Sequence, residues 1–164
     1  MKYLISILLL ISTLSVMAQN EKAHTEKKTF SRTTSISQEI QADASTIWDI
    51  LTEGAKYSEW NSTIVSLEGK IEKGEKIKLK STLDPKRTFK LKVKEFVPNR
   101  KLVWGDAMGE RTYSLEAQGN STLFSMSEKI GGFMFPLFAN KIPSFDKSFE
   151  QFTADLKKKA EKSK

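Results

Sequence analysis

Four polar side chains on predicted strands are the candidates for chemistry in this sequence: Glu128, Asp106, Arg111 and Tyr113. Because side chains alternate between the two faces of a strand, Glu128 shares the apolar face of its strand, and Asp106 shares that of Trp104. A carboxylate on an apolar face needs a partner or a raised pKa, and Arg111 could be that partner. Two interpretations are open: these groups form a polar anchor or a general acid–base group at the end of a cavity, or, as we expect, the strands end there and the groups reach solvent.

Several other chemistries lack the residues they need. The chain has no cysteine and one histidine, His24, in a polar segment. A Ser-His-Asp triad and a transition-metal cluster are therefore not expected, and no glycine-rich phosphate loop is present. The net charge is +7 at pH 7, but no nucleic-acid-binding motif accompanies it. We expect no metal, no cofactor and no nucleic-acid partner.

Alternating apolar and polar residues predict an antiparallel sheet that is covered on one side. A first, exposed strand is predicted over 30–40, and about six more follow between 64 and 130, with turns at Gly74, 98–100 and 119–121. Two short helical segments lie between them, at 42–53 and 55–62; the first has Asp43 or Ser45 as N-cap and ends at Gly54. The predicted sheet has about seven strands.

The cover is predicted to be a long C-terminal helix. Six apolar residues recur at intervals of 4, 3, 4, 3 and 4 and so form one helical stripe: Phe138, Ile142, Phe145, Phe149, Phe152 and Leu156. Because this register continues past Pro143, the helix is expected to kink there without ending. Pro136 suits its first turn. The fold class is α+β, a curved antiparallel sheet around one helix.

Three stretches resemble one known family. "DASTIWDILTEGAKYSEWNSTI" is similar to the entry segment of the polyketide cyclase/dehydrase and START-like superfamily (SRPBCC), also called the birch-pollen-allergen-like or helix-grip fold. "FVPNRKLVW" resembles its strand–turn–strand unit, and "STLFSMSEKIGGF" resembles its last strand and the glycine before the helix. The resemblance covers about residues 31–160. It implies an apolar cavity between sheet and helix that binds a small hydrophobic ligand, with Trp60 near its rim.

Strand parity and helix spacing select the side chains that would line such a cavity, or fill a solid core, which needs the same residue types. The candidate ligand-binding residues are Trp60, Leu79, Phe89, Leu91, Trp104, Tyr113, Phe124, Met126, Phe135, Phe138, Phe145 and Phe149. The stretch "GGFMFPLF" would form the joint before the helix. There Phe133, Met134 and Phe135 could act as a lid or touch a membrane.

Three functional hypotheses follow. The first is a non-enzymatic, monomeric carrier of a small apolar molecule. The second is a cyclase/dehydratase-type enzyme that uses Glu128, Asp106, Arg111 and Tyr113. The third is a co-chaperone-like protein-binding module, as in some relatives, that uses outward lysines of two strands: Lys76, Lys78, Lys80, Lys90, Lys92 and Lys94.

The ends of the chain predict its boundaries and its location. Residues 1–18 have one positive charge, a short apolar run and small residues before a polar switch, which indicates a signal peptide cleaved before Gln19. We expect a polar linker at 19–29, one domain at 30–160 and a basic tail at 161–164. The protein is then exported, periplasmic or secreted, in a bacterium.

Overall fold

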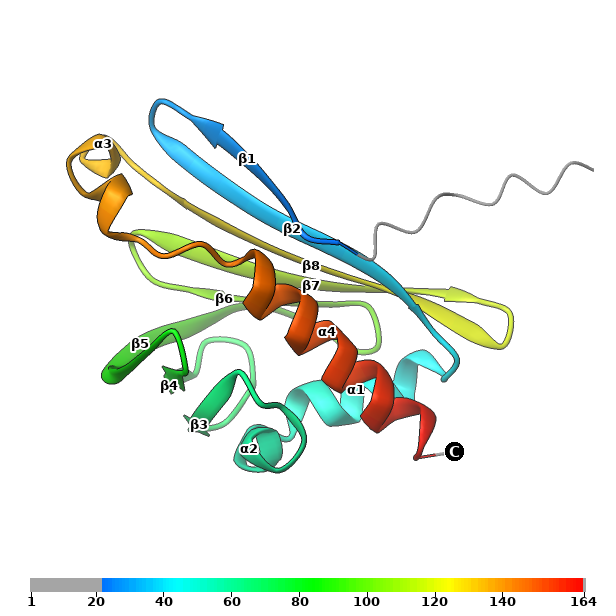
Figure 1. The fold of residues 1–164 in the computed structure, drawn as a ribbon. Coiled ribbons are helices and arrows are strands. Elements are labelled where there is room, and N and C mark those ends of the chain that lie inside the picture. Colours follow the sequence, from blue (N-terminus) through cyan, green and yellow to red (C-terminus); the bar gives the residue numbers. More distant parts are fainter. Residues whose placement is uncertain (1–21, 164) are drawn as a thin grey trace, which may run out of the picture.

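The computed structural model describes residues 22–163, which form one antiparallel sheet that curves around a C-terminal helix (Figure 1). The sheet has eight strands in the order β1-β2-β8-β7-β6-β5-β4-β3. The strands are β1 (His24–Lys28), β2 (Ser31–Ile40), β3 (Ile64–Glu68), β4 (Lys76–Ser81), β5 (Asp84–Val97), β6 (Lys101–Gly105), β7 (Gly109–Gln118) and β8 (Ser121–Gly131). The helices are α1 (Ala44–Thr52), α2 (Tyr57–Trp60), α3 (Phe135–Phe138) and α4 (Asp146–Glu161), with 3₁₀ turns at Gly54–Lys56 and Ala139–Lys141.

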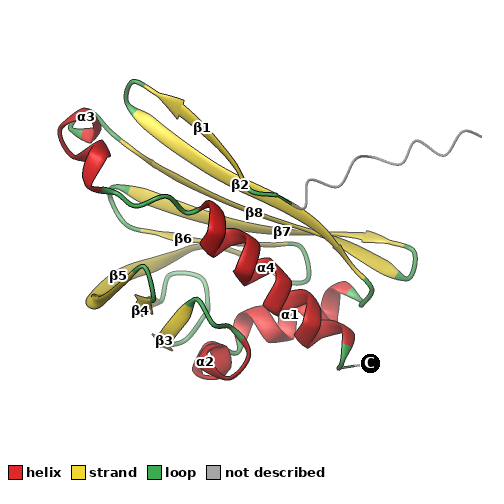
Figure 2. Cartoon of the chain, in the orientation of Figure 1, coloured by secondary structure: helices red, strands yellow, loops and turns green. Residues whose placement is uncertain are grey.

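The α+β class and the helix-grip arrangement predicted from the sequence are confirmed: strands form one curved layer and α4 crosses its concave face (Figure 2). The two short helices after β2 are present, and α1 begins after Asp43. Alternation also assigned the faces correctly on most strands. Ile77, Val93 and Leu102, all predicted to point inward, are at most 1% exposed.

The prediction of a linker over 19–29 is wrong for His24–Lys28, which form β1 and pair with β2. This eighth strand is held by its backbone ladder and by Thr25, whose hydroxyl lies 2.8 Å from that of Thr34 and donates to Asp146 at 2.5 Å. Edge strands are commonly polar, so no apolar alternation marked it. With β1 outside it, β2 is an interior strand, not an exposed one, and every second residue of β2 is buried.

The prediction of one kinked helix from Phe138 to Leu156 is also wrong. The chain forms α3 and a 3₁₀ turn, becomes extended at Ile142 (φ −87°, ψ 120°), and starts α4 only at Asp146. Pro143 has no N–H to donate, and its ring disfavours the helical conformation at the residue before it. The 3,4 spacing is therefore continued by a turn and an extended segment, not by a helix.

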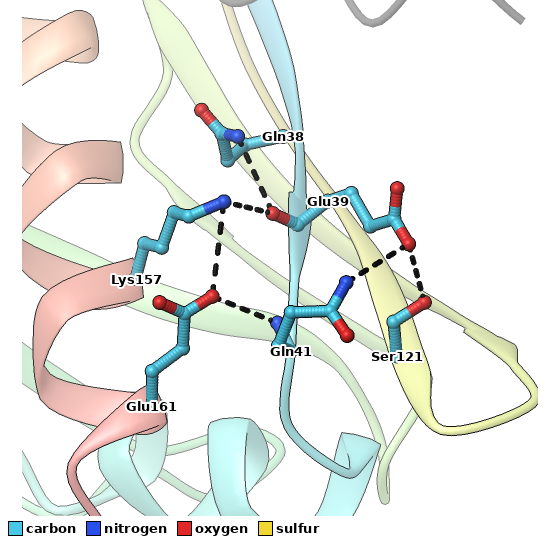
Figure 3. Close-up of polar contacts among 6 residues, drawn as sticks. All are labelled: Gln38, Glu39, Gln41, Ser121, Lys157 and Glu161. Carbon is cyan, nitrogen blue, oxygen red and sulfur yellow. Dashed lines mark hydrogen bonds and ion pairs between the residues drawn. The ribbon is translucent and has the colours of Figure 1, made fainter.

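The C-terminal end of α4 is fastened to β2 by polar contacts (Figure 3). Lys157 Nζ donates to the Glu39 carbonyl oxygen at 2.8 Å, and the Gln41 backbone N–H donates to Glu161 Oε1 at 3.0 Å. The Ser121 hydroxyl at the start of β8 donates to Glu39 Oε1 at 2.6 Å. The predicted basic tail at 161–164 thus begins one residue too early, because Glu161 is the last residue of α4 and holds this end of the helix.

Candidate functional site

The candidate site is a cavity of about 220 Å³ at the end of the sheet opposite the one in Figure 3. Its walls are the β4–β5 hairpin, the β6–β7 turn, the end of β8 and the extended segment before α4. These elements converge on the left of Figure 1. The cavity lies where α4 has not yet begun, so the break at Pro143 leaves this part of the concave face uncovered by helix.

Apolar side chains from the concave face form most of the cavity wall. Among the candidates chosen from the sequence, Leu79, Phe89, Leu91, Trp104 and Phe145 line it. The sequence reasoning missed other apolar wall residues: Leu83, Met108, Ile130 and Ile142. Parity with Glu128 would have found Ile130, but the others lie in turns or in the extended segment, where alternation gives no signal.

Arg111 and Glu128 form a largely buried ion pair in this wall. The two residues are directly opposite each other on β7 and β8, and their side chains are only 16% and 18% exposed. Arg111 Nε donates to Glu128 Oε2 at 2.5 Å, and Arg111 Nη2 contacts the same oxygen. The guanidinium carbon lies 5.2 Å from the centre of the Phe149 ring. The predicted inward pair is therefore confirmed, and it places a largely buried ion pair in a mostly apolar wall.

Arg111 and Tyr113, two ionisable side chains in this region, both stay protonated near neutral pH. Burial lowers the pKa of the Arg111 guanidinium, but the Glu128 carboxylate and then Tyr113 outweigh that effect, and the net pKa is raised. Burial raises the pKa of Tyr113 to about 12, although the charge of Arg111 opposes the rise. The Glu128 carboxyl oxygen Oε2 accepts a hydrogen bond from Arg111 Nε.

Arg32 is a further site residue that the sequence reasoning did not single out. It is 9% exposed, and it donates to the carbonyl oxygens of Ile142 at 3.2 Å and Pro143 at 2.7 Å. Its guanidinium carbon lies 4.8 Å from the centre of the Phe145 ring. Arg32 thus fixes the extended segment that closes one side of the cavity. Its parity with Ile36 on β2 was the available signal.

Asp106 does not lie where parity placed it. The strand ends at Gly105, and Asp106 is exposed in the β6–β7 turn at the cavity rim. Its Oδ1 accepts hydrogen bonds from the backbone N–H groups of Met108 at 2.7 Å and Gly109 at 2.9 Å. Asp106 therefore shapes the turn, as Asp commonly does. Parity alone placed it inward, but the other interpretation holds for this residue: the strand ends and the side chain reaches solvent.

The remaining candidates lie away from the cavity wall. Tyr113, Phe124, Met126 and Phe149 are at most 1% exposed in the core under α4. Trp60 packs edge-on against Phe152, with 5.6 Å between ring centroids. Phe135 and Phe138 belong to α3 and contact each other, with 5.7 Å between centroids. The buried Trp60 indole nitrogen and Tyr113 hydroxyl have no hydrogen-bond partner in the described part of the chain.

A comparison with known protein families shows which family this chain belongs to. The family described as polyketide cyclase/dehydrase and lipid transport matches residues 31–161. The chain belongs to this family. No curated protein matches the sequence.

Solved structures agree with that membership at the level of the fold. A START superfamily protein from Mycobacterium smegmatis is 18% identical with a TM-score of 0.60, covering 80% of this chain and 99% of that one. The Aha1 dimer from Colwellia psychrerythraea is 19% identical with a TM-score of 0.60, covering 79% and 96%. At such identities only the fold is shared, so activity must be argued from this member's own cavity.

Two further observations concern metal binding and membrane-spanning helices in the described part of the chain. Within residues 22–163, no group of His, Cys, Asp or Glu side chains is arranged to hold a metal ion. Over the same range, no helix is both long enough and apolar enough to cross a membrane.

Proposed function

We propose that this protein is a carrier that binds one small hydrophobic molecule in the cavity, with the Arg111–Glu128 pair contacting its polar end. The observation that supports this most directly is a mostly apolar cavity of about 220 Å³ with the largely buried Arg111–Glu128 ion pair in its wall. Drug-sized ligands commonly occupy pockets of roughly 300–1,000 Å³. We therefore expect a compact ligand, or a longer one whose remainder extends through the cavity mouth.

The ion pair also defines the polar group that the ligand should carry. A guanidinium has five N–H donors, and Glu128 uses only those on Nε and Nη2. The donors that Glu128 does not engage suit an acceptor oxygen, such as a carbonyl or a hydroxyl. Because Glu128 already neutralises Arg111, a neutral polar group is a better match than a second carboxylate.

A cavity-filling variant tests this proposal. Leu91→Trp should fill the cavity from β5 and abolish binding of a fluorescent fatty acid or fatty alcohol, and native mass spectrometry should lose any co-purified adduct. Val65→Trp is the matched control, because Val65 is 44% exposed and does not line the cavity. Equal binding by wild type and Leu91→Trp, with both proteins folded, would contradict the proposal.

One observation favours a second candidate function, that of an enzyme: the carboxyl group of Glu128 lines the same cavity. A cyclase or dehydratase would need it ionised, and Glu128→Gln preserves its size while removing that charge. Loss of ligand turnover with retained ligand binding in Glu128→Gln would favour the enzyme. If neither the wild type nor Glu128→Gln converts the ligand into a product, the carrier function is supported over the enzyme.

We also propose that the protein acts after export. The support is the signal-peptide pattern of residues 1–18, which lie outside the described residues. N-terminal sequencing of the protein from its host should begin at Gln19, and an intact Met1 would contradict export by cleavage.

A further inference from the structure

Large apolar side chains gather around the mouth of the cavity and face solvent. Eight large hydrophobic side chains are exposed in the described chain, and all but Val65 and Val97 belong to this group. We call the group the apolar rim: Phe30, Leu83, Met108, Phe133, Met134 and Leu137. Phe133 and Leu137 are the most exposed, at 86% and 72%.

Direct contacts show that three segments of the rim meet. The rings of Phe30 and Phe133 stack with 6.3 Å between centroids. The Gly132 N–H donates to the Phe30 carbonyl at 3.0 Å, and the Gly131 N–H donates to the Met108 carbonyl at 2.9 Å. The β1–β2 turn, the β6–β7 turn and the segment before α3 are therefore side by side (Figure 1). Met108 and Leu83 also line the cavity, so the rim continues into it.

The backbone presents these side chains outward. Gly132 adopts φ +131°, a conformation that favours glycine, and the chain turns there into α3. Phe135 is then the buried residue of this short helix, while Phe133, Met134 and Leu137 remain outside. Soluble proteins seldom expose contiguous apolar patches of this kind unless a partner or a membrane covers them.

Charge around the rim indicates which partner covers it. Lys129 and Lys141 are exposed near it, and neither forms an ion pair within the described residues. Acidic side chains also lie at the mouth: Glu110 pairs with Lys94, Asp106 accepts two backbone hydrogen bonds, and Asp84 lines the wall. Lys141 lies in the cavity wall beside the mouth. Apolar side chains bordered by unpaired lysines match the acyl and phosphate layers of an anionic bilayer.

We propose that the apolar rim docks on an anionic phospholipid bilayer, so that the cavity mouth faces the lipid. This inference rests on the proposed carrier function, because a hydrophobic ligand dissolved in a bilayer could then enter without crossing water. Phe133 and Leu137 would enter the acyl region, and Lys129 and Lys141 would contact lipid phosphates.

Vesicle co-sedimentation tests the docking. The chain is used from Gln19 onward, because residues 22–163 contain every strand and helix described and the apolar N-terminal segment would itself bind lipid. Phosphatidylglycerol vesicles should bind the wild type. Phe133→Ser/Leu137→Ser should weaken that binding by more than about tenfold, because each serine would bury much less apolar surface in the bilayer than the side chain it replaces. Val65→Ser/Val97→Ser, which removes the exposed apolar residues outside the rim, should bind like the wild type.

Charge and ligand binding are measured on the same proteins. Lys129→Gln/Lys141→Gln should reduce binding to phosphatidylglycerol vesicles and remove most of its salt dependence, while Lys90→Gln/Lys92→Gln should not. Binding of the fluorescent fatty acid in solution should be unchanged in Phe133→Ser/Leu137→Ser, Val65→Ser/Val97→Ser and Lys90→Gln/Lys92→Gln, because none of these residues lines the cavity. Failure of docking and failure of ligand binding are therefore separate results. Equal sedimentation of wild type and Phe133→Ser/Leu137→Ser would overturn the proposal. So would self-association of the wild type without vesicles that the same variant abolishes.

Discussion

The two ends of the sheet differ in whether helix α4 covers them. At the end drawn in Figure 3, the side chains of Ile40, Leu51 and Leu156 are fully buried, and polar contacts hold α4 to β2. At the other end α4 is absent, an extended segment replaces it, and a cavity opens among exposed apolar residues. We infer that the packed end supplies most of the free energy of unfolding. Side chains at the open end can therefore change to suit a ligand with only a small loss of stability.

Truncating one phenylalanine at each end should give the largest difference. Phe152 is 1% exposed and contacts three aromatic rings at the packed end, whereas Phe89 is half-buried in the cavity wall. Phe152→Ala should lower the free energy of unfolding by about 3–5 kcal/mol. Phe89→Ala should lower it by only about 1 kcal/mol, because less surface is lost. Urea unfolding followed by circular dichroism measures both, and equal losses would remove the distinction between the ends.

The Arg111–Glu128 pair should give the next largest effect. Arg111→Met leaves Glu128 without its partner in a largely buried place and should cost about 3 kcal/mol of unfolding free energy. Adding Glu128→Leu to that variant should restore most of the loss, since a buried pair can often be replaced by apolar residues at little cost. Ligand binding should stay impaired in the double variant. A double variant that binds normally would show that the pair has no part in recognition.

This pair was predictable from the sequence, but its place in the molecule was not. The period of two fixes which face of a strand a side chain occupies, and it placed Arg111, Glu128 and Phe124 inward. It does not say how far along the curved sheet the cavity lies. Phe124 therefore shares a face with Glu128, yet it is buried in the core, while Glu128 lines the cavity.

Predictions from side-chain pattern were wrong where backbone geometry decides the structure. Asp106 follows the last residue of β6, and alternation has no meaning beyond it. Pro143 ends a helical pattern that the apolar spacing alone would continue. In β1 the pairing is made by the backbone and by Thr25, so polar composition gave no indication of a strand.

The smallest expected effect concerns Asp146, through which β1 holds the start of α4. Hydrogen bonds from Ser144 and then Thr25 lower the pKa of this carboxyl below 3.8, although its slight burial opposes the shift. Since the folded pKa is the lower one, the carboxylate stabilises the fold above about pH 4 and loses that contribution as the pH falls through the folded pKa. The contribution should be a few tenths of a kcal/mol, roughly, because solvent screens the group.

Asp146→Asn should therefore flatten the fall in unfolding midpoint between about pH 5 and about pH 2, and Asp49→Asn, an exposed change on α1, is the control. Because an amide oxygen accepts the Thr25 hydrogen bond more weakly than the Asp146 carboxylate does, the same variant should also speed hydrogen exchange in β1 while leaving β7 unchanged. If β1 exchanged no faster, its backbone ladder alone would hold it, and the contact with α4 would not help to close the open end.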